Sequence, residues 1–308
     1  MLSVGLSMMV KNEEGNLADC LGPIADLFEQ VVVIDTGSTD RTRELLADRF
    51  GITPLAGELS ADECFTLATQ RNRSFGELKT PWILTLDADE RIDREQLLAV
   101  FRHGDADLPD GVFFGWNTEF GADEPVVQDY KLCMFRHGHR HRGLVHDTVQ
   151  PSLREAGAHA VWQDVSMRHL PAVARRLHKQ DFYATRLACA QAREPGWMRY
   201  HWFAGYTHYR AGRLAQAREQ LERVHAPRPA LFPVESLNAS MVLAGIHARE
   251  SRVAECRAVL RDALAFFAQV AHDFEVKVNT RLRPWLEEAH EFALQGALDR
   301  IEPYRFAY

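Results

Sequence analysis

Two carboxylates separated by one residue, Asp87 and Asp89, are the first side chains in this sequence with an evident chemical use. They follow the apolar run Trp82–Leu86, which has the length and composition of a buried strand. Carboxylate oxygens are preferred ligands of Mg²⁺ and Mn²⁺, ions that can bridge to nucleotide phosphates. Alternatively, one carboxylate caps the helix expected over Asp93–Phe101 and the other is solvated. An acid pair beside a buried strand end is electrostatically costly unless a cation or hydrogen bonds compensate, which strengthens the case for a cation.

Asp35 also ends a predicted strand, Val31–Ile34, and leads into a turn rich in Gly, Ser, Thr and Asp. A carboxylate in this place can accept hydrogen bonds from the N–H of a uracil-type base or from ribose hydroxyls. It can equally form an Asx turn into Gly37-Ser38. Neither role excludes the other.

Strand-like and helix-like segments alternate over the first 100 residues, which predicts an α/β fold with a mostly parallel, Rossmann-like sheet. Ligands of such sheets lie beyond the carboxyl ends of the strands, where the acids occur here. The expected elements are strands at Leu2–Val10, Val31–Ile34 and Trp82–Leu86, helices at Asn16–Phe28 and up to Phe50, and less regular strands at Gly111–Trp116, Tyr130–Phe135 and Leu144–Val149.

From Ala172 onward Ala, Leu, Arg and Glu dominate at helical spacing, so we predict two domains, 1–171 and 172–308, with a boundary near Pro171. A weak internal echo recurs at a shift of 39 residues in the helical half, for example between Gly212-Arg213 and Ser251-Arg252. Small residues where helices approach and larger apolar ones between them suit stacked helical hairpins. We therefore expect a tetratricopeptide-like (TPR-like) helical domain.

Bulk properties narrow the function. The net charge of −7 argues against broad binding of nucleic acid phosphates. No apolar run approaches the roughly 20 residues of a membrane span, and the N-terminus lacks the features of a signal peptide. The five cysteines include no close pair of the kind found in zinc sites. A cytoplasmic protein without a transmembrane segment is expected.

Four ordered motifs carry a family resemblance: Leu6–Glu14, Val31–Thr42, Gln70-Arg71-Asn72 and Pro81–Glu90. Together they resemble the inverting family 2 glycosyltransferases of the GT-A fold, closely over the first 100 residues and more loosely to about residue 170. The resemblance implies a nucleotide-sugar-binding domain of α/β class, followed here by the helical half.

The resemblance also implies roles for single residues. Val10 and Glu13 lie where the first strand opens onto the nucleotide base, and Asp35 matches the acid that contacts uracil or ribose. Arg71 matches the basic residue that reaches the base and the diphosphate. The remaining two assignments place Asp87 near the ribose and make Asp89 the principal ligand of Mn²⁺ or Mg²⁺.

A subset of the family has a further motif, which is similar to Leu132–Arg136 and Gly143–Asp147 here, followed by His169. By this likeness Asp147, in place of the usual Glu, is the expected catalytic base. Glu90 and Asp129 are the alternatives.

His146 or His169 is expected to complete the metal shell, although a structural, hydrogen-bonded histidine is the other interpretation of each. The run Arg136–Arg142 alternates His and Arg. It suits a loop facing phosphate or acceptor, or a solvated loop.

The predicted function is metal-dependent, inverting transfer of a sugar from a nucleotide-sugar, with UDP-sugar expected, to a saccharide, lipid-linked saccharide or peptide. The alternative is an inactive scaffold that binds peptides or proteins through its helical repeats. A nucleotidyltransferase is disfavoured because the loop after the first strand, Lys11–Asn16, is acidic and not basic. The helical half is a candidate surface for a protein partner or for homo-oligomers.

Overall fold

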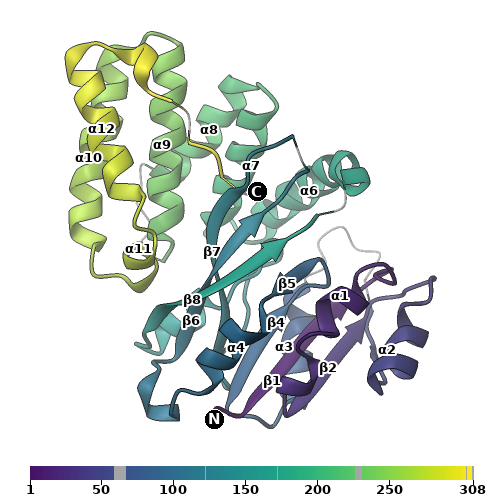
Figure 1. Ribbon diagram of the computed structural model, residues 1–308. Helices are drawn as coiled ribbons and strands as arrows, with labels where there is room; N and C mark the ends of the chain where they lie inside the picture. Colours follow the sequence, from purple (N-terminus) through teal and green to yellow (C-terminus); the bar gives the residue numbers. More distant parts are fainter. Residues whose placement is uncertain (59–66, 122, 172, 226–230, 303, 307–308) are drawn as a thin grey trace. The chain divides into compact units, whose positions relative to one another are not determined.

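The computed structural model describes residues 1–58, 67–121, 123–171, 173–225, 231–302 and 304–306. Eight strands within these ranges form one sheet in the order β3-β2-β1-β4-β7-β6-β8-β5 (Figure 1). The strands are β1 Val4–Val10, β2 Gln30–Asp35, β3 Leu55–Ala56, β4 Trp82–Leu86, β5 Glu90–Ile92, β6 Gly111–Thr118, β7 Val127–Arg136 and β8 Ala160–His169. Strands β3, β2, β1 and β4 run parallel, as the alternating pattern predicts.

The second half of the sheet is mixed. β7 is antiparallel to both β4 and β6, β8 is parallel to β6, and β5 is antiparallel to β8. In the β4–β7 pair Leu84 lies opposite Met134. Because the two strands are antiparallel, Asp87, three residues after Leu84, lies beside Lys131, three residues before Met134.

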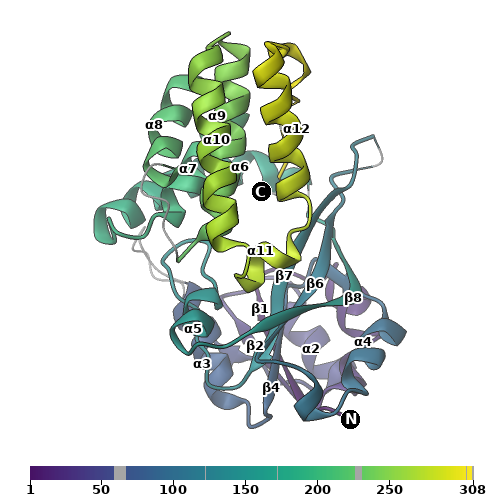
Figure 2. The same ribbon diagram turned by 90° about the vertical axis from the view of Figure 1, so that its left-hand side faces the viewer.

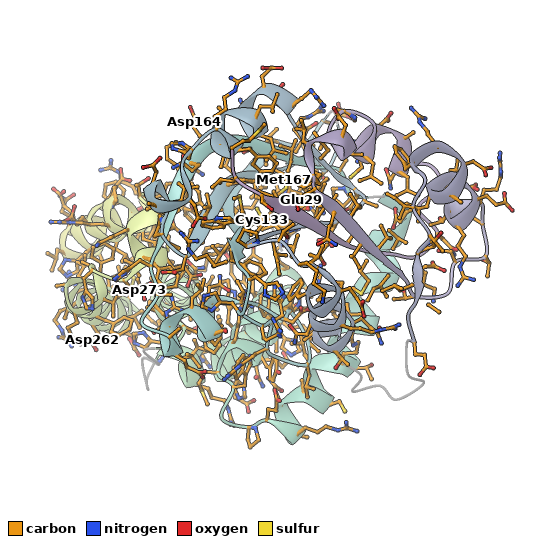
Figure 3. The ribbon with its side chains drawn as sticks, turned by 90° about the horizontal axis from the view of Figure 1, so that it is seen from below. Glu29, Cys133, Asp164, Met167, Asp262 and Asp273 are labelled. Atoms are coloured by element: carbon orange, nitrogen blue, oxygen red, sulfur yellow. The ribbon has the colours of Figure 1, made fainter. Side chains whose placement is uncertain are left out.

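The two faces of the sheet are covered by different helices. On one face, alternate residues of β1 such as Leu6 and Met8 pack with apolar residues of α1 (Leu17–Leu21) and α4 (Arg94–Phe101) in one buried cluster. That cluster also contains Cys133 of β7 and Met167 of β8 (Figure 3). On the other face lies α3 (Leu67–Glu77), whose Ser74 hydroxyl is 2.5 Å from the Ser7 hydroxyl.

Helix ends in this unit follow capping chemistry. α2 (Thr42–Phe50) ends at Gly51, whose φ of 66° is the left-handed conformation that favours glycine. α4 begins after Asp93, whose Oδ1 accepts a hydrogen bond from the Gln96 N–H at 2.9 Å. Capping of this helix therefore falls to Asp93, which leaves the carboxylates of Asp87 and Asp89 for other partners.

The strands expected at Gly111–Trp116 and Tyr130–Phe135 are confirmed by β6 and β7. The prediction of a strand at Leu144–Val149 is wrong. Apart from a single bridge between Arg142 and Thr148, that segment is irregular, and His146 has a φ of 52° that breaks an extended strand. β8 is an additional strand that the sequence pattern did not reveal. The prediction placed a strand in the Leu144–Val149 loop and none at Ala160–His169.

The chain divides into two compact units, Met1–Lys179 and Gln180–Phe306. The remaining helices are α5 Gln150–Glu155, α6 Val173–Arg193, α7 Arg199–Arg210, α8 Leu214–His225, α9 Pro233–Arg249, α10 Val253–Val270, α11 Phe274–Val278 and α12 Leu282–Gln295, with short 3₁₀ turns at Ala25–Leu27, Asp105–Asp107 and Leu298–Arg300. The domain boundary near Pro171 stays a prediction.

Within the second unit, α7 packs on α8 and α9 packs on α10 as helical hairpins, and Figure 2 shows α9 and α10 side by side. The two hairpin turns contain Gly212 and Ser251, which both have positive φ, 73° and 57°. These residues are 39 positions apart, the shift of the internal echo. A methyl group on Gly205 would come 2.6 Å from Leu221, so this hairpin requires a glycine for close approach. The helical architecture fits a TPR-like domain.

None of the helices in the described ranges is both long enough and apolar enough to cross a membrane.

Candidate active site

Asp87 lies immediately beyond the end of β4 and is held by two cations. Its Oδ1 accepts a hydrogen bond from Arg71 Nη2 at 3.1 Å, and its Oδ2 accepts one from Lys131 Nζ at 3.1 Å. Burial alone would raise the pKa of Asp87, but the charges of Lys131 and Arg71 outweigh it and hold this pKa well below its usual range. Asp87 is therefore a permanently ionised anchor between α3 and β7.

Glu90, in β5, is the fully buried member of the same cluster. Its two oxygens accept hydrogen bonds from Lys131 Nζ at 2.6 and 2.8 Å. They also accept from the Trp116 indole N–H at 2.8 Å and from the Asp87 backbone N–H at 2.9 Å. Burial raises the pKa of Glu90, while the charge of Lys131 opposes that rise. Because its oxygens are occupied and inaccessible, Glu90 is a poor candidate for a base that must touch an acceptor.

Asp147 joins this cluster through Arg71. Its Oδ2 lies 3.4 Å from Arg71 Nε and 2.7 Å from His141 Nδ1. Burial would raise the pKa of Asp147, but the hydrogen bond from His141 and the charge of Arg71 lower it. Burial also lowers the pKa of His141, which favours the neutral imidazole. The loop is fixed to α3 because the side chain of Asn72 exchanges hydrogen bonds with the backbone of His141, at 2.8 and 2.9 Å.

Asp89 has different neighbours. Its Oδ2 lies 3.6 Å from His169 Nε2, and its backbone carbonyl accepts from the Leu170 N–H at 2.8 Å. The other ring nitrogen of His169 lies 3.0 Å from Thr118 Oγ1, and the ring stacks on Trp116. β5 and β8 hold the pair together, because Glu90 and His169 are opposite each other in the ladder.

The Asp89–His169 pair fits a divalent cation. Two ligand atoms bound to one ion at about 2.1 Å lie about 3 to 4 Å apart, and the observed spacing falls in that interval. In the parts of the chain that the structure describes, no cluster of three His, Cys, Asp or Glu forms a complete metal site.

The residues expected at the nucleotide base lie on or after β1 and β2, which follow β4 in that order across the sheet. Asp35 ends β2, pairs with Val10 in the β1–β2 ladder, and is buried. Its carboxylate accepts hydrogen bonds from the Ser38 N–H, at 3.1 Å, and from the Ser38 hydroxyl, and it forms an ion pair with Arg43. The Asx-turn interpretation of Asp35 therefore describes its present contacts. Glu13 belongs to the neighbouring loop, where its N–H donates to Thr42 Oγ1 at 2.7 Å.

Two arginines of the Arg136–Arg142 run, expected to form either a loop facing phosphate or acceptor or a solvated loop, pair with acids away from Asp87. Arg136 ends β7 opposite Trp82, the first residue of β4, and therefore lies at the edge of the sheet away from Asp87. It pairs with Asp105 at 3.0 Å. Arg142 pairs with Glu155 at 2.6 Å. Of this run, His141 is the residue that reaches the charged cluster. No described contact places His146 beside Asp89, so its role as a metal ligand stays a prediction.

The site contains three side chains that our sequence reasoning did not select: Lys131, Trp116 and Thr118. In the sequence, Lys131 follows Asp129 by two residues and is expected to be solvated. The composition of a strand does not indicate which strands will be its neighbours in the sheet. Trp116 and Thr118 share one face of β6 because they are two residues apart in a strand, but the sequence of β6 does not alternate and gave no signal for them.

Comparison with known proteins identifies the type of domain that carries this site. Residues 7–153 match the profile of the family described as Glycosyl transferase family 2. A segment of 92 residues is 36% identical to a TPR repeat-containing protein of Synechococcus elongatus, and it covers 30% of this chain and 22% of that protein. The chain therefore spans under a quarter of the length of that relative.

Solved structures show more distant likenesses. The structure of S. aureus TarS residues 1–349 in complex with UDP is 14% identical with a TM-score of 0.44, over 100% of this chain and 94% of that one. Glucosyl-3-phosphoglycerate synthase from Mycobacterium tuberculosis, in complex with Mn²⁺, UDP-glucose and phosphoglyceric acid, is 17% identical with a TM-score of 0.29, over 37% and 44% of the two chains.

Proposed function

Since residues 7–153 form a glycosyl transferase family 2 domain, we propose that this chain transfers a sugar, with inversion, from a nucleotide-sugar to an acceptor in a reaction that requires Mn²⁺ or Mg²⁺. UDP-sugar is the donor that the motif resemblance favours. The observation that carries the proposal is the pair of Asp89 and His169, 3.6 Å apart beside the charged Asp87 cluster.

Asp89 and His169 would hold the cation. When bound, a divalent ion stabilises negative charge on the leaving diphosphate. Arg71 contributes a second positive charge that stays in place, because its Nη2 donates to Asp87, its Nε lies 3.4 Å from Asp147, and both acids raise its pKa against the effect of burial. A guanidinium has five N–H donors, so groups remain for the donor's diphosphate.

Asp147 is the proposed base. Both of its described contacts, to His141 and Arg71, use Oδ2. That arrangement orients the carboxylate and leaves Oδ1 to accept the acceptor's proton. The lowered pKa keeps Asp147 ionised at neutral pH, as a base must be before it takes up a proton.

The donor and the metal are tested with a thermal-shift panel of nucleoside diphosphates and their sugars, each with and without Mn²⁺. A ligand of the folded state raises its apparent stability, by about 2.7 kcal/mol at 100 times Kd. We expect a UDP compound to stabilise the chain more with Mn²⁺ than without it. A flat response to all compounds would contradict the proposal and favour the inactive scaffold.

The base is tested with matched variants in a donor-turnover assay. Asp147→Asn should lower kcat by about 10²-fold or more while donor affinity changes little, because general bases contribute about 10²- to 10⁴-fold. Asp129→Asn is the control, since Asp129 lies on β7 and was, with Glu90, one of the two alternative bases. A larger loss in Asp129→Asn than in Asp147→Asn would transfer the assignment.

A further inference from the structure

Two side chains of β6 hold the imidazole of His169 from two directions. Thr118 is the ladder neighbour of His169 in the β6–β8 pair, and its Oγ1 lies 3.0 Å from His169 Nδ1. Trp116, two residues earlier and on the same face of β6, stacks on the imidazole with 4.6 Å between ring centroids and 20° between planes. The ring therefore cannot turn without losing one of these contacts.

The stacking partner is itself fixed. The indole N–H of Trp116 donates to Glu90 Oε1, and Lys131 neutralises the Glu90 carboxylate. Glu90 is also the ladder neighbour of His169 in the β5–β8 pair. The plane of the His169 ring is thus tied to the buried charge cluster through one aromatic contact and one hydrogen bond.

Thr118 is fully buried, and a buried hydroxyl needs a hydrogen-bond partner. The hydroxyl of Thr118 has such a partner in His169 Nδ1. A hydroxyl can donate or accept. With the imidazole proton on Nε2, that proton faces the Asp89 carboxylate and the Thr118 hydroxyl donates to Nδ1. With the proton on Nδ1, the Thr118 oxygen accepts it and Nε2 presents a lone pair beside Asp89.

A cation can bind only the second tautomer, because a ligating imidazole nitrogen must be unprotonated. We propose that Thr118 is a positioning residue that stabilises the Nδ1–H tautomer of His169 when a divalent cation binds, and that Trp116 fixes the plane of the ring. By rotating its hydroxyl, Thr118 serves both the metal-free and the metal-bound forms. This inference rests on the proposed function, in which Asp89 and His169 share the cation.

The test is a titration of the full-length chain with Mn²⁺ in the presence of saturating UDP, followed by electron paramagnetic resonance of free Mn²⁺. Thr118→Val keeps the shape but removes the hydroxyl, and it should weaken Mn²⁺ binding by about 10- to 100-fold, the usual effect of removing such an outer partner. Thr118→Ser keeps the hydroxyl and should bind Mn²⁺ nearly as wild type.

Thr80→Val is the matched control. It also removes a buried threonine hydroxyl, which donates to the Trp82 carbonyl at 2.8 Å, at the start of β4 and not at its carboxyl end. Its Mn²⁺ affinity should equal that of wild type. Thermal midpoints of all variants, measured without Mn²⁺, separate a loss of folding from a loss of binding.

A spectroscopic measurement reads the tautomer directly. In ¹⁵N-histidine-labelled chain with Mg²⁺ and UDP, the His169 signal, identified by its loss in His169→Gln, should show protonated Nδ1. If wild type binds Mn²⁺ and Thr118→Val binds it equally well, or if Nε2 carries the proton in the Mg²⁺ complex, the role of Thr118 is refuted while the proposed function stands. If wild type shows no saturable Mn²⁺ binding, the metal-dependent function fails and this inference fails with it.

Discussion

Asp87 and Asp89 are one residue apart, yet their electrostatic surroundings differ. Asp87 belongs to a cluster in which the chain supplies its own cations, Arg71 and Lys131, for each buried carboxylate. Asp89 Oδ2 lies 3.6 Å from the imidazole Nε2 of His169, whereas the partners of Asp87 are a guanidinium and an ammonium group. The comparison teaches that only one of the two acids is left for an external cation. The other acid builds the framework that keeps the first one in position.

The largest effect is expected when Lys131 is removed from the cluster of buried acids that it and Arg71 neutralise. Lys131→Met leaves Glu90 buried without its counter-charge, and such changes cost about 3–5 kcal/mol in the free energy of unfolding. Urea unfolding followed by fluorescence measures the loss. Adding Glu90→Gln to Lys131→Met should recover much of it, because the uncompensated charge is then absent.

Lys79→Met is the control for Lys131→Met, since Lys79 is exposed and its Nζ donates to the Gly76 carbonyl at 3.2 Å. Its unfolding free energy should change by less than about 0.5 kcal/mol. A loss below about 1 kcal/mol in Lys131→Met would show that the cluster is not the rigid framework described above.

Removing the carboxylate of Asp89 should lower turnover and leave the free energy of unfolding nearly unchanged. Asp89→Asn is expected to lower metal-dependent turnover by about 10²- to 10³-fold, since the ion stabilises the leaving group by several kcal/mol. Asp93→Asn, four residues later, changes an acid that caps α4, and asparagine caps equally well. Turnover of the Asp93→Asn variant should match wild type. Similar losses in both variants would remove the distinction between them.

Arg71 connects the cluster to the proposed donor, and its geometry matters as well as its charge. Arg71→Lys keeps the charge but cannot reach Asp87 and Asp147 with two fixed nitrogens. We expect donor affinity, measured by calorimetry with UDP and Mn²⁺, to fall by about 10-fold, which is 1.4 kcal/mol. Wild-type affinity in Arg71→Lys would show that a point charge is sufficient.

The smallest effect is expected at the exposed partner of Asp35. Arg43 is 53% exposed, so its ion pair with Asp35 is largely screened by solvent. Arg43→Ala should cost less than about 1 kcal/mol in unfolding free energy and leave turnover unchanged. A turnover loss of 10-fold or more would place Asp35 and Arg43 together in the donor site.

The sequence was sufficient for the parallel half of the fold and for the acids at its edge, because β-branched runs such as Val31–Ile34 and their polar ends are local signals. It was insufficient for β8, in which Gln163 and Asp164 interrupt the apolar run. The Lys131 and Thr118 contacts depend on strand order and register, which join residues 40 or more positions apart. No local pattern reports such pairings, so those partners were missed.

The placement of β8 has a consequence for how this protein is made. The strand that delivers His169 is the last one of the sheet to leave the ribosome, yet its neighbours β5 and β6 are synthesised well before it. Asp89 must therefore wait through about 80 further residues, or several seconds of elongation, before His169 can join it. Until then the edge formed by β6 has an open ladder, and the proposed cation site lacks His169.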